Sequence, residues 1–284
     1  MRADVGLEFM RGSNDYTQDT FNLDINLSSS TSLNFTDEQV VMSSYTSLVK
    51  TYSADLNYKF NEYFNIGVNG SVSPETDDAK SAGWGANAAY NSGGDDFSWG
   101  ISLPYSQTTL AQYWQASSVI TNARTKKTRT VASSGWTDLV QSNIAPSINF
   151  GLFGAITLNM GYSYYSYNRD LDNFSNNLSR LTGTINTAKG ARSAATTASF
   201  GNLPSLIYGF PVNIYSAGIS DEPLDSLTIG YDWSDTTYAL EQPEIETSTL
   251  SVSYLFGPVI KVKASYESLS NNDVYKTAGI QWLW

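Results

Sequence analysis

The sequence predicts one all-β domain over residues 1–284, an up-and-down antiparallel β-barrel that spans a membrane. Three observations predict it: apolar and polar residues alternate along many segments, the segments are long, and their connections alternate between short and long. Charged residues make up only 15% of the chain, whereas soluble globular proteins contain roughly 25%. No apolar run approaches the roughly 18 residues that a membrane helix needs, so spanning by helices is excluded.

The alternation has a period of two residues. In residues 52–60, aromatic and aliphatic side chains occupy every second position between Ser, Asp, Asn and Lys, and residues 21–28, 64–72 and 156–164 repeat this pattern. A strand places alternate residues on opposite faces, whereas a helix cannot sort such a pattern onto one face. These segments therefore predict strands with one apolar face.

Fourteen strands are predicted, an even number that brings both termini to one side of the membrane. In chain order they cover residues 3–12, 19–29, 31–37, 50–60, 64–73, 82–91, 97–106, 138–150, 155–168, 207–218, 226–235, 245–256, 258–268 and 273–284. The pattern is weak in 31–37 and in 207–218, so twelve strands is the alternative. Tight joins are predicted at 28–31, 61–63, 91–96, 151–154 and 256–258, and the longest loops at 107–137 and 169–206. Short periplasmic turns opposite long extracellular loops are typical of bacterial outer-membrane barrels.

A soluble β-sandwich would also alternate, but two features favour the barrel. The predicted strands of about 10–12 residues exceed the usual 5–6 of globular sheets and suit a tilted bilayer crossing. Aromatic residues also gather at strand ends beside the short joins, as an aromatic girdle at a membrane interface requires. These residues are Tyr58, Phe60, Tyr63, Phe64, Tyr90, Phe97, Phe150, Phe153, Tyr254 and Phe256.

The last strand alternates to the final residue, with Ala278, Ile280, Trp282 and Trp284 on one face. This segment resembles the C-terminal strand of Gram-negative outer-membrane barrel proteins, which ends on an aromatic residue, most often Phe. The resemblance implies that Ile280, Trp282 and Trp284 form the signal read by the barrel assembly machinery. In size and strand number the chain resembles the small monomeric 14-stranded porins.

The alternation also predicts which side chains line the lumen. Besides many Ser, Thr, Asn and Gly residues, the charged ones are Glu8, Asp24, Asp55, Lys59, Asp232, Lys261, Lys263 and Glu267. Eight strands are filled by side chains and sixteen leave an aqueous channel, so fourteen strands should leave an opening. The alternative for each charge is a structural role, pairing across strands in the barrel wall.

The two longest predicted loops hold 8 of the 16 basic residues but only two of the 27 acidic ones. Arg124, Lys126, Lys127 and Arg129 form the densest basic group. They could fold inward as a constriction that sets ion selectivity, bind lipopolysaccharide phosphates, or remain a solvated loop. The three hypotheses stay open at the level of the sequence.

The residue types argue against an enzyme and against cofactors. The chain has no Cys and no His, which removes thiol and imidazole nucleophiles, bases and metal ligands. The paired acids Asp77-Asp78 and Asp95-Asp96 lie in predicted turns, where solvation explains them better than catalysis. A pI of about 4.4 disfavours nucleic-acid binding.

The sequence therefore predicts an outer-membrane porin or channel for passive diffusion of small hydrophilic solutes and ions. The alternative is a barrel plugged by its long loops, with 169–206 as the plug, that acts through protein partners. Outer-membrane lipids, lipopolysaccharide and the assembly machinery are the expected partners. Alternation begins almost at Met1, so we expect no signal peptide in this sequence and a mature, multi-pass outer-membrane form.

Overall fold

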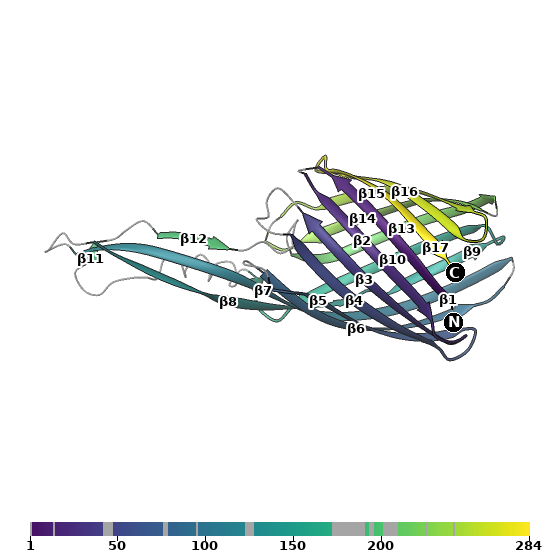
Figure 1. The fold of residues 1–284 in the computed structure, drawn as a ribbon, viewed down its shortest axis with the longest axis horizontal. Helices are drawn as coiled ribbons and strands as arrows, with labels where there is room; N and C mark the ends of the chain where they lie inside the picture. Colours follow the sequence, from purple (N-terminus) through teal and green to yellow (C-terminus); the bar gives the residue numbers. More distant parts are fainter. Residues whose placement is uncertain are drawn as a thin grey trace.

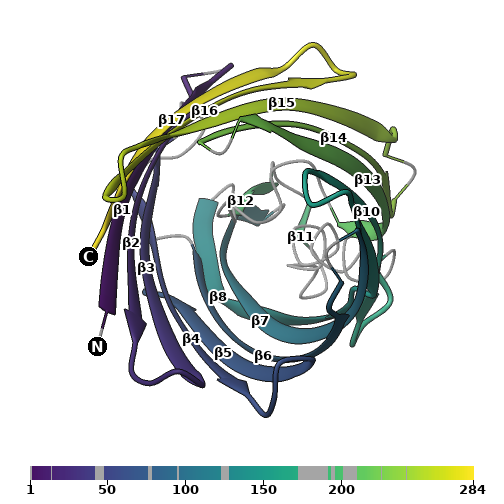
Figure 2. The same ribbon diagram turned by 90° about the vertical axis from the view of Figure 1, so that its right-hand side faces the viewer.

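The computed structural model describes residues 2–13, 15–41, 48–75, 79–94, 96–122, 128–171, 191–192, 196–200, 210–224, 226–240 and 242–284. They form a closed antiparallel β-barrel whose wall has fourteen strands (Figures 1 and 2). The predicted fold class and strand number are thereby confirmed, and the twelve-strand alternative is wrong. No helix in these ranges is long and apolar enough to cross a membrane.

Fifteen stretches build the fourteen wall strands. They are β1 (Arg2–Gly12), β2 (Thr17–Asn26), β3 (Thr31–Val41), β4 (Val49–Lys59), β5 (Phe64–Ser73), β6 (Ala79–Ser92), β7 (Phe97–Asn122), β8 (Thr128–Ile144), β9 (Ser147–Leu152), β10 (Ile156–Tyr167), β13 (Pro211–Leu224), β14 (Leu227–Tyr238), β15 (Ile245–Phe256), β16 (Ile260–Leu269) and β17 (Val274–Leu283). β8 and β9 are two parts of one wall strand, because both pair with β7 on one side and with β10 on the other.

The first and last strands close the barrel. β1 pairs with β17 in an antiparallel register that runs from Asp4 opposite Leu283 to Gly12 opposite Tyr275. The backbone N–H of Trp284 adds a 3.1 Å hydrogen bond to the carbonyl oxygen of Ala3. Both termini lie at the same end of the barrel (Figure 1), as the even strand number predicts.

The strands with weak sequence patterns are full wall strands. The strand predicted at 31–37 continues to Val41, and the one predicted at 207–218 lies instead at Pro211–Leu224. The pattern is weak in β3 because Asp37 and Gln39 stand on the face that carries Leu33 and Phe35. The ladder of backbone hydrogen bonds holds the strand despite these polar side chains.

The prediction of a long loop at 107–137 is wrong. β7 and β8 stay paired from Tyr105 opposite Ile144 to Thr121 opposite Thr128, and this hairpin projects past the barrel rim (Figure 1). The sequences of its arms are rich in Ser and Thr and lack apolar alternation, so they read as a loop. Their backbones are nevertheless paired in an antiparallel ladder. From the segment 169–206, β11 (Ala191–Arg192) and β12 (Thr196–Phe200) pair with β7 beside this hairpin. Most of the segment falls outside the described ranges.

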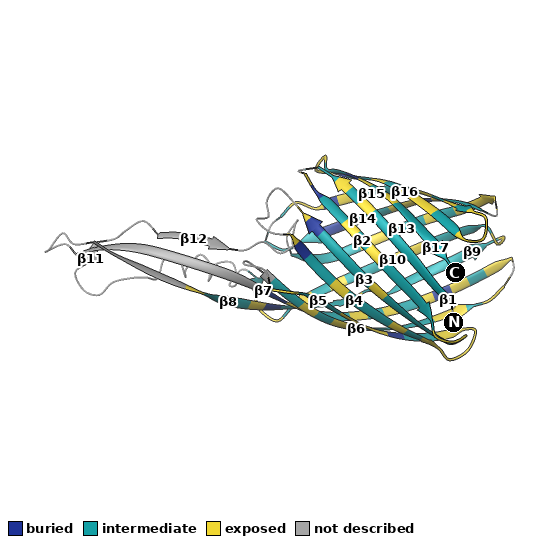
Figure 3. Ribbon diagram, in the orientation of Figure 1, coloured by how far each residue is buried: buried dark blue, intermediate teal, exposed yellow. Residues whose placement is uncertain are grey.

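The outward face is apolar and exposed. Phe9, Leu56, Val68, Ile101 and Leu250 are among its exposed side chains, and exposed positions alternate along the strands (Figure 3). The described residues include few buried apolar side chains, because a membrane barrel turns its apolar surface to lipid instead of a packed core.

The predicted aromatic girdle is present at the end with the short turns. Its rings contact one another in pairs along the outward face. Examples are Tyr58–Phe60, Tyr90–Trp99 and Tyr254–Phe256, with ring centroids 5.0, 5.3 and 4.5 Å apart.

Candidate functional site

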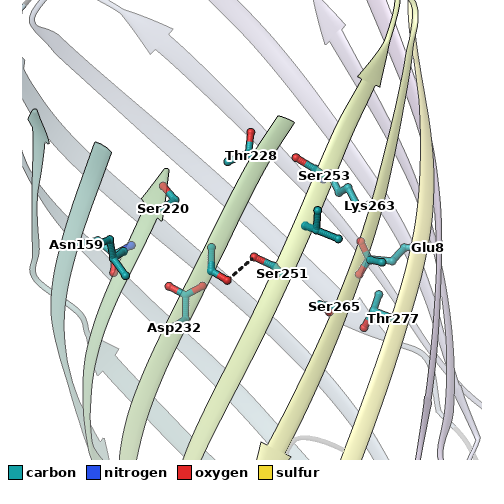
Figure 4. A pocket seen from close by; sticks show the side chains of 14 residues that line it. Glu8, Asn159, Ser220, Thr228, Asp232, Ser251, Ser253, Lys263, Ser265 and Thr277 are labelled. Carbon is teal, nitrogen blue, oxygen red and sulfur yellow. Dashed lines mark hydrogen bonds between the residues drawn. The ribbon is translucent and has the colours of Figure 1, made fainter. Parts of the chain in front are cut away.

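The inner face of the barrel is the candidate functional site. On β16, Val262, Ala264 and Tyr266 belong to the apolar outward face, so Lys261, Lys263, Ser265 and Glu267 face the lumen. Residues opposite each other on neighbouring strands lie on the same face of the sheet. Followed around the barrel in this way, the register places all eight predicted charged residues on the inner face. Glu8, Asp232 and Lys263 are seen there directly (Figure 4).

One transverse row of the wall joins two of the predicted charges. Glu8 on β1 lies opposite Gly279 on β17, and Gly279 lies opposite Lys263 on β16. The row continues through Ser253 on β15 to Thr228 on β14. We call these five residues the Glu8–Lys263 row. It crosses the seam where the barrel closes, so residues that are far apart in the sequence become neighbours.

This row borders two hollows in the wall. The larger, of about 350 Å³, is lined by Glu8, Asp232 and Lys263 together with the hydroxyl groups of Thr228, Ser251, Ser253, Ser265 and Thr277 (Figure 4). The smaller, of about 90 Å³, is lined by Glu8, Asp24 and Lys263 with Asn22 and Gln281. Glu8 and Lys263 belong to both, so the two hollows meet at the Glu8–Lys263 row.

A second row carries the other acidic side chains. Asp4, Asp24, Asn34 and Asp55 lie opposite one another on β1 to β4, and we call them the acidic row. The side-chain amide of Asn34 donates a hydrogen bond to Asp24. Three carboxylates on neighbouring strands give this part of the wall a concentrated negative charge.

The remaining predicted charges lie apart from these two rows. Lys59 lies opposite Asn65 near the short turns, and Lys261 lies opposite Gln281. Glu267 and Asp232 flank Thr249 in a row of their own. The eight predicted pore-lining residues therefore form several separate groups on the β14–β17 and β1–β4 side, instead of one cluster.

The opposite side of the lumen carries no charge among its described side chains. Along β5 to β10, the inward positions are filled by Asn, Ser, Thr, Gly, Ala and a few larger neutral residues. Asn91 and Asn149, for example, flank Gly100 in one row. We call this surface the neutral wall. Sequence reasoning missed this division, because it depends on which strands face each other.

The end opposite the termini departs from the predicted polar wall. Inward-facing Tyr16, Val40, Ile245, Leu269 and Tyr275 form a buried apolar cluster there, with Met10 and Tyr238 packed against it. The rings of Tyr16 and Tyr275 meet edge to face, with centroids 5.2 Å apart. An apolar collar on one side of this mouth therefore lies beyond the charged rows.

Two acidic wall residues were also missed. Glu38 lies beyond the predicted end of its strand, where it accepts a 2.8 Å hydrogen bond from the amide of Gln18, which in turn bonds to Tyr16. Asp4 lies on the same face of β1 as Glu8, four residues earlier, so the alternation in the sequence could have predicted that it faces the lumen. The described residues contain no group of His, Cys, Asp and Glu that could hold a metal ion.

The other candidate residues are placed only in part. Arg129 lies in β8 opposite Ile120, within the projecting hairpin, whereas Arg124, Lys126 and Lys127 lie outside the described residues. At the C-terminus, Ile280 and Trp282 face outward in β17, opposite Leu7 and Val5 of β1. The side chain of Trp284 is 76% exposed.

No protein-family model matches the sequence, and no curated protein matches it. Solved structures do share its fold. The CymD monoaromatic hydrocarbon channel aligns over 99% of this chain and 87% of its own, with 11% identity and a TM-score of 0.52. Omp33 of Acinetobacter baumannii aligns over 100% and 98%, with 9% identity and a TM-score of 0.50. The KdgM porin aligns over 98% of both chains, with 10% identity and a TM-score of 0.44.

At such identities the likeness to the CymD channel and to Omp33 is one of fold, and it agrees with the barrel described above. The predicted resemblance to porin-like outer-membrane barrels is therefore confirmed. The chain is a closed antiparallel barrel of fourteen strands and shares the barrel fold of outer-membrane porins and channels.

Proposed function

We propose that this protein is an outer-membrane channel through which small hydrophilic solutes and ions diffuse passively. The observation that carries the proposal is the polarity of the two faces of one closed sheet. Exposed aromatic and aliphatic side chains cover the outside, while hydroxyls, amides and charges line the inside (Figure 4). Such a wall is stable only if lipid lies outside and water lies inside.

The mechanism follows from the width and lining of the barrel. Fourteen strands lie between the eight that side chains fill and the sixteen that leave an aqueous channel. Wall hydroxyls and amides can replace part of the hydration shell of a passing solute, and wall charges bias which ions enter. The acidic row favours cations on its side of the lumen, and we propose a weak cation preference.

The loop-plugged barrel is less well supported than an open channel. Its plug would come from 169–206, but the two described strands of that segment, β11 and β12, pair with β7. Figure 1 shows them beside the hairpin that projects from the barrel. An enzyme is not proposed, since the chain has neither His nor Cys to supply the usual nucleophile or base.

We further propose the partners that a membrane barrel needs. The apolar outward face and its aromatic girdle suit the acyl chains and headgroups of the outer membrane, with lipopolysaccharide on the outside. The C-terminal strand ending at Trp284 would be read by the barrel assembly machinery. Small solutes or ions would occupy the lumen, and no cofactor is needed for such transport.

Two measurements on the purified, detergent-folded protein test the proposal. Folded barrels resist SDS, so gel mobility should change on boiling. Insertion into a planar bilayer should then give discrete current steps, and a salt gradient should give a reversal potential that reports ion preference. Boiled protein is the matched control and should give no steps. A folded barrel that inserts but never conducts would contradict the channel and favour the plugged alternative.

A further inference from the structure

We propose that the Glu8–Lys263 row is a binding site in the channel wall for small zwitterionic solutes of the α-amino-acid class. The inference rests on the proposed channel function and adds a solute class to it. In this site, the ammonium of Lys263 would bind the solute carboxylate, and the carboxylate of Glu8 would bind the solute ammonium.

The first step of the argument is that both charges are available. Neither Glu8 nor Lys263 forms an ion pair with any residue that the structure describes. By contrast, Arg11–Asp19 and Lys80–Glu75 on the described surface form ion pairs with N–O distances of 2.8 Å. Opposite charges two strands apart that stay unpaired leave room for a ligand between them.

Gly279 leaves space for the Glu8 side chain to reach over the row, and the room for a ligand lies in the two hollows that meet there. Gly279 stands between Glu8 and Lys263 in the row, and it has no side chain to separate them. A Cβ at this position would lie 3.2 Å from the carbonyl oxygen of Leu7 and 3.5 Å from Cγ of Glu8. The Glu8 side chain therefore lies over Gly279, at the junction of the two hollows.

The chemistry of the lining selects the solute. An ammonium is a donor only and a carboxylate is an acceptor only, so the two ends of the site demand complementary groups. Asp232 in the larger hollow and Asp24 in the smaller one add two carboxylates to the acidic end of the site. A simple anion at Lys263 would therefore lie beside carboxylates, and a simple cation at Glu8 would leave the Lys263 ammonium beside it without a counter-charge. A zwitterion satisfies both ends at once.

Most of the remaining lining suits a polar solute of modest size, and Ile219, Val252 and Ala264 add apolar surface to the larger hollow. Ser251, Ser253 and Thr277 place hydroxyl groups around the larger hollow (Figure 4). Hydroxyls both donate and accept, so they can bond to either end of a zwitterion or to a polar side chain. The volume of about 350 Å³ lies at the lower end of the roughly 300–1,000 Å³ found for small-molecule sites.

The test is the block of single-channel current by added solute. Alanine or serine should interrupt the current through the wild-type channel in a concentration-dependent way, whereas glycerol and acetate at equal concentration should not. Lys263→Gln and Glu8→Gln should each weaken the block by about tenfold or more, as loss of a charged hydrogen bond implies. Lys261→Gln is the matched control, because it removes the same charge from the same face of β16 without touching either hollow.

The outcomes separate the site from the channel. A preference for the amino acid that Lys263→Gln removes and Lys261→Gln retains supports the site. Equal block by glycerol overturns it, as does an equal loss in both lysine variants, which would reflect wall charge in general. A channel that conducts without any amino-acid block overturns the site alone. A barrel that never conducts removes the proposed channel, and the site with it.

Discussion

Arg11 and Lys276 lie directly opposite each other across the seam between β1 and β17, and both side chains belong to the outward face. Like charges opposite each other destabilise a strand pair. The carboxylate of Asp19 on β2 offsets part of this repulsion, since it lies 2.8 Å from Nη1 of Arg11. Three surface charges therefore modulate the stability of the seam, which the backbone ladder between β1 and β17 holds closed.

Removing the compensating charge should weaken the barrel slightly. Asp19→Asn should lower the free energy of unfolding by up to about 1 kcal/mol, the range for an exposed ion pair. The difference should shrink at high salt because screening weakens the repulsion. Urea unfolding in detergent at low and high salt measures both effects. Glu75→Gln, which breaks the pair with Lys80, is the control, and an equal loss there would argue against a special role for the seam.

The acidic row should set the ion preference of the channel. Asp24→Asn combined with Asp55→Asn should shift the reversal potential in a KCl gradient toward anions, most clearly at low salt where screening is weak. Asp19→Asn removes a carboxylate from the outward face and should leave the reversal potential unchanged. If the outward substitution acts as strongly as the inward pair, the assignment of the faces is wrong.

The basic group of Arg124, Lys126, Lys127 and Arg129 remains a testable prediction. If it forms a constriction, replacing all four by Gln should raise cation preference and change conductance. If it binds lipopolysaccharide, the same variant should keep its reversal potential and associate less with that lipid. A solvated loop predicts neither change. Identical reversal potentials for wild type and variant would contradict the constriction.

The terminal aromatic residue should matter for assembly. Trp284 follows the closing strand and is 76% exposed. Its backbone N–H donates to the carbonyl oxygen of Ala3 and to the Asp4 carboxylate, at 3.1 and 3.2 Å. Trp284→Ser keeps these backbone bonds, so any loss of insertion reports recognition of the side chain. The amount in the outer membrane should fall, whereas Trp99→Ser, in the same girdle, should insert near wild-type levels. If Trp284→Ser and Trp99→Ser insert equally well, the Trp284 side chain is not part of an assembly signal.

Two glycines of the neutral wall should tolerate alanine differently. At Gly85 a Cβ would lie 2.8 Å from the backbone carbonyl oxygen of Tyr105, which cannot move without the strand. At Gly100 the nearest atoms are the side-chain ends of Asn91 and Asn149, which can rotate into the lumen. Gly85→Ala should therefore cost about 1–3 kcal/mol in urea unfolding, as overpacking does, and Gly100→Ala clearly less. If Gly100→Ala lowers the free energy of unfolding more than Gly85→Ala does, the side-chain amides of Asn91 and Asn149 are held rigidly.

The fold was predictable because alternate residues of a strand in a membrane barrel face lipid and water, and their polarity differs accordingly. Lipid on one side and water on the other produce a polarity pattern with a period of two along nearly every strand, as in Tyr52 to Phe60. The short turns are recognisable as tight joins between these patterned segments. The weak patterns misled at β3, where Asp37 interrupts the apolar face, and in the projecting hairpin, where the sequence shows no apolar alternation. In both places the backbone pairing shows the strands that the sequence pattern does not.

The sequence by itself determined the fold class, the strand number and the inward parity of the eight charged residues named from it, since alternation is a local property, but it missed Asp4 and Glu38. Only the tertiary structure decided which of these residues are neighbours. Glu8 and Lys263 stand on strands at opposite ends of the chain, and they flank Gly279 because the barrel closes there with one particular register. Register and closure depend on the backbone pairing of every strand around the ring, and no single segment of the sequence contains that information.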